Sequence, residues 1–296
     1  MAQSICSVDV KMSREERSLH FLRKFVIDCF FICALIALVI VTRDVWQGFE
    51  RGFFCGDESL MYPYKSDTVS TEMLRLYGIG LPAIVILFCE WMLLRKEDDE
   101  PCFKFPLPLW MRGFYCVFAC FSYGMCFVEL TTNVAKNVIG RPRPHFFDLC
   151  RPNVNCSLSQ WQHRYIESHE FECTGNNYTE KFNDMHMSFL SGHSSASAYT
   201  MIYLALYLEK RMVWRSTRIF RHVLQFSAVM LSWFTALSRV TDYKHHWSDV
   251  LAGYFTGLTF AVLVWTWGTD LLQPKCKHQL VSQHEVCSQQ QKAESA

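Results

Sequence analysis

The sequence predicts an all-α integral membrane protein with six transmembrane helices. Half of its 296 residues are hydrophobic, and they are gathered into blocks of about 20 residues, the length at which a helix crosses a bilayer. Polar segments separate these blocks. The formal net charge is only +1, so there is no basic excess to neutralise phosphates and we expect no nucleic-acid partner.

The predicted spans follow the apolar blocks in chain order. They cover roughly residues 25–42, 75–94, 111–133, 192–209, 221–238 and 248–268. No small-residue cleavage site follows the first block, so we expect it to be a retained helix and not a signal peptide. Asp28 and Glu90 fall in apolar blocks, and their simplest interpretation is that they reach an interface from near a helix end.

The charges between the spans predict the orientation. Six spans place the N-terminal tail (1–24), the flexible C-terminal tail (273–296) and two short charged connections on the same side of the membrane. Their Lys and Arg content makes that side cytosolic. The domain of residues 25–272 then carries its long loop, 134–190, on the outer side.

Two sequons and four cysteines support an outer location for that loop. Asn155 and Asn177 each begin an Asn-x-Ser/Thr sequence, an acceptor for N-glycosylation. The cysteines of the predicted outer segments are Cys55, Cys150, Cys156 and Cys173. An oxidising compartment allows them to form disulfides, and the sequence leaves their pairing open.

Three polar clusters adjoin the outer ends of predicted helices. They are Lys136–Pro144, Ser188–Ser195 and Ser238–Asp249. A compact bundle brings such helix ends together although they lie far apart in the sequence. We therefore expect an active site at the outer mouth of the bundle.

The first chemistry that these clusters indicate is anion binding. Lys136, Arg143 and Arg239 are donors suited to phosphoryl oxygens. The Ser191-Gly192-His193 turn opens a predicted helix, where free backbone N–H groups and the helix dipole favour an anion. The sequence contains neither a GxxxxGK[ST] loop nor a carboxylate cluster for magnesium, so we expect no metal and no cofactor.

Histidines and an acid complete a set of residues for phosphoryl transfer. One imidazole can attack phosphorus, a second can protonate the leaving oxygen, and an acid can hold the nucleophile's tautomer. Asp249 follows His245 by four residues and His246 by three. Both spacings place a histidine on the face of Asp249 in a helix, so spacing favours His245 only slightly.

The three clusters resemble the signature of the phosphatidic acid phosphatase type 2 superfamily: K-x6-RP, SGH and SR-x5-H-x3-D. They appear here as Lys136 to Pro144, Ser191 to His193, and Ser238 to Asp249. The segment from Arg51 to Lys65 resembles the first outer loop of the animal lipid phosphate phosphatases. Leu190 stands where the wider superfamily often has proline.

The resemblance implies a role for each matching residue. His245 becomes the nucleophile, His193 the general acid and then the base, and Asp249 the residue that orients His245. Lys136, Arg143, Arg239, Ser191 and Gly192 become the phosphate-binding set. Arg141 lies outside the pattern and is interpreted as a headgroup or loop contact, while Asp242, Lys244 and His246 are interpreted as supporting residues.

The resemblance also implies an activity. We expect metal-independent dephosphorylation of lipid phosphate monoesters through a phosphohistidine intermediate, on the extracellular or lumenal face. The substrates it implies are phosphatidate, lysophosphatidate, sphingosine 1-phosphate and ceramide 1-phosphate. The plasma membrane is the expected location, with internal membranes as the alternative, and homo-oligomers are compatible with the family. Alternative functions are a phosphatase for a soluble ester in the ER lumen, a non-enzymatic signalling relative and a transporter.

Overall fold

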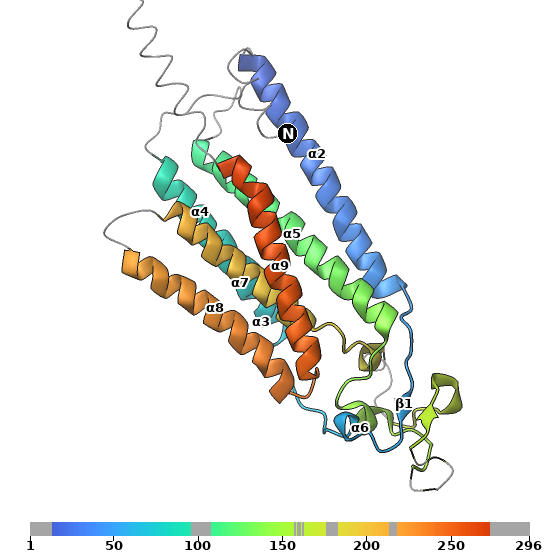
Figure 1. Ribbon diagram of the computed structural model, residues 1–296. Helices are drawn as coiled ribbons and strands as arrows, with labels where there is room; N and C mark the ends of the chain where they lie inside the picture. The colour runs from blue at the N-terminus through green and yellow to red at the C-terminus, as the bar shows by residue number, and fades with distance from the viewer. Residues whose placement is uncertain are drawn as a thin grey trace, which may run out of the picture.

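The computed structural model describes a bundle of long helices with a small loop-rich unit beyond one end. The described residues are 14–95, 108–156, 158, 161, 163–175, 183–212 and 218–272. The long helices run side by side, and the short elements β1 (Phe53–Phe54) and α6 (Phe146–Cys150) gather past one end of them (Figure 1). The sequon at Asn177 and the tail 273–296 lie outside the described residues.

Each predicted span falls on a helix or on a run of joined helices. The elements are α2 (Arg14–Ile40) with η1 (Val41–Val45); α3 (Thr71–Arg75), η3 (Leu76–Gly80) and α4 (Leu81–Leu94); α5 (Leu109–Ile139); α7 (Gly192–Arg211); α8 (Arg218–Thr241); and α9 (Trp247–Leu272). The segments η1 and η3 are single π-helical turns. The first helix begins at Arg14, earlier than the predicted start at residue 25.

Five of these helical segments are long and apolar enough to cross a membrane. They are Phe21–Val45, Thr71–Leu94, Leu109–Ile139, Arg218–Thr241 and Trp247–Gly268. Large apolar side chains on α2 and α8 point away from the protein, as lipid-facing side chains do; Phe30, for example, is 67% exposed. The predicted integral membrane protein is therefore supported by its helices.

The sixth predicted span, 192–209, coincides with α7, which is not among the five apolar segments. Its polar side chains face other helices, and Ser194, Ser197 and Thr200 are all buried. Because α7 is enclosed by other helices, it needs fewer apolar side chains than a helix at the periphery of the bundle that faces lipid. The count of six spans stays a prediction at this helix.

α7 packs most extensively against α9 and α8. Two glycines of α9, four residues apart, allow a close approach: a Cβ on Gly253 would lie 2.6 Å from the Ser191 carbonyl oxygen, and one on Gly257 would lie 2.2 Å from the Ser195 carbonyl oxygen. Small residues at this spacing let membrane helices pack backbone to backbone. The α7–α9 contact therefore excludes any larger residue at these positions.

The loop-rich unit has its own apolar core and two disulfides. β1 pairs antiparallel with β2 (Tyr165–Ile166), and Phe53, Phe146 and Ile166 are buried together. The bridges are Cys55–Cys156 and Cys150–Cys173. The pairing that the sequence left open is thus set by this unit.

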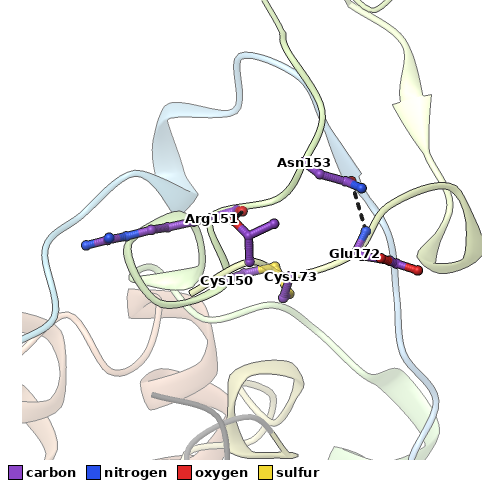
Figure 2. Close-up of a disulfide and its surroundings, with 6 residues drawn as sticks. Cys150, Arg151, Asn153, Glu172 and Cys173 are labelled. Atoms are coloured by element: carbon purple, nitrogen blue, oxygen red, sulfur yellow. Dashed lines mark hydrogen bonds between the residues drawn. A yellow bond between two sulfur atoms is a disulfide. The ribbon is translucent and has the colours of Figure 1, made fainter. Parts of the chain in front are cut away.

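The second bridge closes a turn that also has local hydrogen bonds. Figure 2 shows Cys150–Cys173 beside the Asn153 side chain, whose Oδ1 accepts a hydrogen bond from the backbone N–H of Glu172 at 3.0 Å. The backbone N–H of Asn153 donates in return to the Glu172 carbonyl oxygen at 3.0 Å. The bridge and the paired hydrogen bonds together hold the two sides of the loop.

The interpretation of Asp28 and Glu90 as helix-end side chains is wrong for both. Asp28 accepts a hydrogen bond from the Tyr115 hydroxyl at 2.6 Å, between α2 and α5. Glu90 is fully buried and joins α4 to α7, because its carboxylate accepts hydrogen bonds from Arg211 at 2.8 and 2.5 Å and from the Tyr207 hydroxyl at 2.9 Å. Both acids have partners on a second helix, so neither has to reach an interface.

The Glu90–Arg211 pair gives an asymmetric prediction for stability. Arg211→Met leaves a fully buried carboxylate without its cation, so the free energy of unfolding should fall by about 3–5 kcal/mol. Glu90→Leu should cost less, because the Arg211 side chain is 23% exposed and can turn to solvent. The double variant should recover most of the loss, measured by unfolding in detergent. A double variant as unstable as the sum of the two single variants would contradict this account.

Candidate active site

The three polar clusters meet at one end of the bundle. Six of the predicted site residues line a single cavity of about 640 Å³: Lys136, Arg143, Gly192, His193, Arg239 and His245. Ser191 and Asp249 are fully buried. They are joined directly, since the Ser191 N–H donates to the Asp249 carbonyl oxygen at 3.2 Å. The structure thus brings all eight predicted residues into one region.

Helix ends position these residues. α7 and α9 both begin here, so their free N–H groups and positive dipole ends point to the same region. α5 ends here, one turn after Lys136, at Gly140 with a φ of 56°. A side chain on Gly140 would meet the Phe49 carbonyl oxygen at 1.7 Å. Glycine is therefore required both for the left-handed conformation and for the close approach.

Two arginines of the predicted phosphate-binding set are buried and paired with acids. Arg143 contacts Asp184 through its Nη2, and its Nε donates to the Asp184 carbonyl oxygen at 2.8 Å. Arg239 lies 3.0 Å from Asp67. The carboxyl pKa of Asp184 is below its ordinary value, because Arg143 and nearby cations outweigh the opposing effect of burial. Neither acid was identified from the sequence, where single acids in loops carry no pattern.

The mouth of α7 holds a cation and several polar atoms without partners. The Lys136 Nζ lies 3.6 Å from the position that a Cβ on Gly192 would take, so it sits at the start of α7. Among the described residues, Ser191 Oγ, His193 Nε2 and Arg239 Nε are buried without a hydrogen-bond partner. Buried polar atoms are usually paired in folded proteins. These atoms fit a polar ligand such as a phosphoryl group.

The His245 ring is fixed with one nitrogen available. Its Nδ1 lies 2.6 Å from the Ser188 carbonyl oxygen. A carbonyl oxygen only accepts, so Nδ1 carries the proton and Nε2 keeps its lone pair. Burial, together with Arg143, Lys136 and Arg239, holds the pKa of His245 well below its ordinary value. The ring is therefore a neutral base or nucleophile at neutral pH.

The predicted hydrogen bond from the His245 ring N–H to the Asp249 carboxylate is not present in the structure, because His245 Nδ1 bonds the Ser188 carbonyl oxygen. The Asp249 carboxylate accepts from Ser188 Oγ at 2.6 Å and from Arg141 at 2.5 Å, and it lies 3.2 Å from His246 Nδ1. The reason is the start of α9 at Trp247. His245 precedes the helix, so the four-residue spacing does not place it over Asp249.

Asp249 is connected to His245 through one intermediate residue. Ser188 donates its hydroxyl to Asp249 and offers its carbonyl oxygen to His245. Arg141, which the sequence pattern left outside the site, neutralises the buried Asp249 carboxylate and also donates to Ser248 Oγ at 2.9 Å. The interpretation of Arg141 as a headgroup or loop contact is therefore wrong. The signal in the sequence that could have identified Arg141 was its position within the Lys136–Pro144 cluster.

The supporting residues of the 242–246 turn are tied to the first outer loop. Asp242 is fully buried and accepts from the Thr68 backbone at 2.7 Å and from the Thr68 hydroxyl at 2.6 Å. Lys244 Nζ lies 3.7 Å from the centre of the Tyr64 ring. These contacts hold the turn that presents His245.

A third histidine, His145, also lines the cavity. Its Nδ1 lies 2.8 Å from the Tyr243 carbonyl oxygen, and Tyr64 packs edge-on against its ring. Burial lowers the pKa of His145 to about 4, with smaller effects from neighbouring cations. No spacing in the sequence singled it out.

Among the residues that the structure describes, there is no group of three or more His, Cys, Asp or Glu side chains suited to a metal. The positive charge around the cavity comes from Lys and Arg side chains, which include the predicted phosphate-binding residues Lys136, Arg143 and Arg239 as well as Arg43, Arg75 and Lys244.

Residues 117–272, more than half of the chain, match the PAP2 superfamily. The chain belongs to this superfamily. A Drosophila melanogaster protein named "Putative phosphatidate phosphatase" is 41% identical over 77% of the chain, which spans 63% of that relative's length. Phospholipid phosphatase 1 of Rattus norvegicus is 38% identical, with 82% of the chain and 84% of the relative covered.

Phospholipid phosphatase 2 of Homo sapiens is 33% identical, with 86% of each chain covered. No solved structure matches the chain. The resemblance inferred from the three motifs is confirmed by these relatives, and so is the expectation of a phosphatase.

Buried His145 predicts a loss of stability in acid. Between pH 6.5 and about 4 it stays neutral in the folded protein but is protonated in the unfolded chain, so the unfolded state binds more protons and the free energy of unfolding falls as the pH drops. The whole contribution is about 3 kcal/mol. Unfolding of His145→Asn in detergent from pH 7 to 4 should therefore show a smaller acid loss than wild type.

The control is His169→Asn, which changes an exposed histidine of the outer loop. It should follow the wild-type pH dependence. Equal acid losses for wild type and His145→Asn would contradict the prediction.

Proposed function

We propose that this PAP2 protein removes phosphate from lipid phosphate monoesters by way of a phosphohistidine on His245. The observation that carries the proposal is the His245 ring, which is neutral, held through Nδ1 by Ser188 and placed in a cavity that Lys136, Arg143 and Arg239 also line. Nucleophile, acid and anion-binding groups thus lie in one cavity. The names of the relatives support phosphatidate and related phospholipids as the substrate class.

In the first step, His245 Nε2 attacks phosphorus and the bond from phosphorus to the lipid oxygen breaks. Burial and Arg239 lower the pKa of His193 to about 3, so in this scheme the ring takes up a proton when the phosphate dianion of the substrate enters. His193 then gives this proton to the leaving oxygen, which departs as an alcohol. In the second step, His193 takes a proton from water, the water oxygen bonds to phosphorus and the phosphorus–nitrogen bond breaks. Inorganic phosphate leaves, and both histidines return to their starting states.

The cations stabilise the charge of the transferring group. Lys136, Arg143 and Arg239 converge on the cavity, and the N–H groups at the start of α7 add further donors. Preorganised donors of this kind are typically the largest single contribution to catalysis. No metal is required in this scheme, and we expect hydrolysis to continue in EDTA.

The depth of the site suits a lipid substrate. Exposed tryptophans mark both ends of the bundle: Trp46 and Trp247 at the end with the site, and Trp91 and Trp267 at the other. Tryptophan is enriched at membrane interfaces. We take α7 as a sixth span, so that a headgroup at the interface enters the site while its chains stay in the leaflet.

The orientation follows from the six spans. The site, the disulfides and the sequons then face the extracellular or lumenal side, with glycosylation at Asn155 and Asn177, and the plasma membrane is the proposed location. Asn155 is exposed on the loop-rich unit. Disulfides at Cys55 and Cys150 agree with an oxidising compartment.

The roles of the two histidines predict different defects. His245→Asn should abolish phosphate release from every substrate, because no phosphoenzyme can form. His193→Ala should lower kcat for a lipid alkyl phosphate by about 10²–10⁴-fold but should still be phosphorylated by p-nitrophenyl phosphate, whose leaving group needs no proton. Rapid quenching should therefore trap an acid-labile phosphohistidine in His193→Ala.

The matched control is His169→Asn, an exposed histidine away from the cavity, which should keep wild-type turnover. All assays contain EDTA and purified protein in detergent. Turnover by His245→Asn close to wild type, or activity that depends on an added metal, would overturn the mechanism.

The proposed orientation has a direct biochemical test. Endoglycosidase should increase the gel mobility of the wild-type protein from cells, and this shift should vanish in the Asn155→Gln/Asn177→Gln double variant. A sequon placed in the opposite connection by Lys96→Asn with Asp98→Ser should stay unmodified. Glycosylation at residue 96 would reverse the orientation.

A further inference from the structure

The cavity continues past the phosphate-binding residues into the membrane-spanning part of the bundle. There its lining includes apolar residues of α2, α3, η3 and α5: Ile36, Val39, Leu74, Ile79 and Met125. A substrate with its phosphate at the start of α7 would place its carbon chain along this wall. The acid Glu129 lies among these apolar residues, and Arg43, Arg75 and Cys126 also line the cavity.

Glu129 lies directly below Lys136 on the same helix. The two residues are seven apart in α5, which places them on one face and about 10 Å apart along the axis. The Lys136 ammonium sits at the start of α7. Glu129 therefore lies about two helical turns below Lys136, on the path from the site to the apolar wall.

The Glu129 carboxylate has no partner of its own in the described part of the chain. Neither a hydrogen bond nor a salt bridge to Glu129 exists among those residues. The charges that face it are Lys136, Arg43 and Arg75, and Arg43 is already 3.7 Å from Asp44. An acid inside a membrane span is costly unless it serves a function. This acid has its carboxylate free to meet a ligand in the cavity.

We propose that Glu129 determines substrate specificity by accepting a hydrogen bond from the lipid backbone. The donor is an ammonium or hydroxyl group on the carbon next to the one that bears the phosphate. An ammonium gains most, because a carboxylate forms its strongest hydrogen bonds with charged donors. A lipid whose neighbouring carbon carries an acyl ester has no donor there and gains nothing from Glu129. This inference rests on the proposed lipid phosphatase function.

Two substitutions separate charge from hydrogen bonding. Glu129→Gln keeps the size and an accepting oxygen but removes the charge, and Glu129→Leu removes both. Three substrates in mixed micelles test them: sphingosine 1-phosphate with an ammonium, lysophosphatidate with a hydroxyl, and phosphatidate with an ester at that carbon. The readout is the kcat/KM of each variant relative to wild type.

The expected result is a change of selectivity. Both variants should lose about 10- to 100-fold in kcat/KM for sphingosine 1-phosphate. For lysophosphatidate, Glu129→Gln should stay near wild type, whereas Glu129→Leu should lose severalfold. Phosphatidate should change by less than about twofold in either variant, and so should the soluble ester p-nitrophenyl phosphate.

The control is Glu58→Gln, an exposed acid of the outer loop, which should leave all four rates unchanged. Equal losses for all substrates would show that Glu129 only balances the nearby cations and would overturn the proposal. Equilibrium binding of the three lipids is measured in parallel. If the wild-type protein binds the lipids with a donor more tightly than phosphatidate but hydrolyses none of them, the phosphatase function is wrong and the role of Glu129 in binding stands. If the three lipids bind equally well, the proposed role of Glu129 is wrong.

Discussion

The close approach of α7 to α9 is the constraint on which the site depends. Gly253 and Gly257 leave room for the α7 backbone, and Ser194 Oγ adds a hydrogen bond to the Val250 carbonyl oxygen at 2.7 Å. The two helices start at the same end, so their N-termini converge. His193 on the first turn of α7 and His245 just before α9 are thereby brought into one cavity. Without this contact the two histidines would belong to separate loops.

Charge in the site is balanced in two layers. Facing the cavity, Arg143 and Arg239 are held by Asp184 and Asp67; behind it, Arg141 neutralises Asp249. Buried charges are costly when unpaired, so these acids keep the cations ordered while no substrate is bound. In the proposed reaction, a phosphoryl group competes with the acids for the arginines, and the same competition favours release of the product phosphate.

Much of the fold could be predicted because bilayer length and apolar blocks are local properties of the sequence. The positions of the spans and the three motifs followed from such patterns. The contacts of Asp249 could not be predicted from local sequence spacing. A four-residue spacing implies contact only if the helix includes both residues, and α9 begins after His245. The partner of His245 is the Ser188 carbonyl oxygen, a backbone atom that no sequence motif can reveal.

The sequence by itself determined which residue types are available: two histidines, an acid and three cations next to helix ends. Those properties depend on residue identity and on apolar length. The tertiary structure decided how they are connected, including the Cys55–Cys156 pairing and the use of Arg141 as the partner of Asp249. It also placed Glu129 in the cavity. Contacts between distant segments depend on how the helices pack, and the sequence of a single segment does not determine that packing.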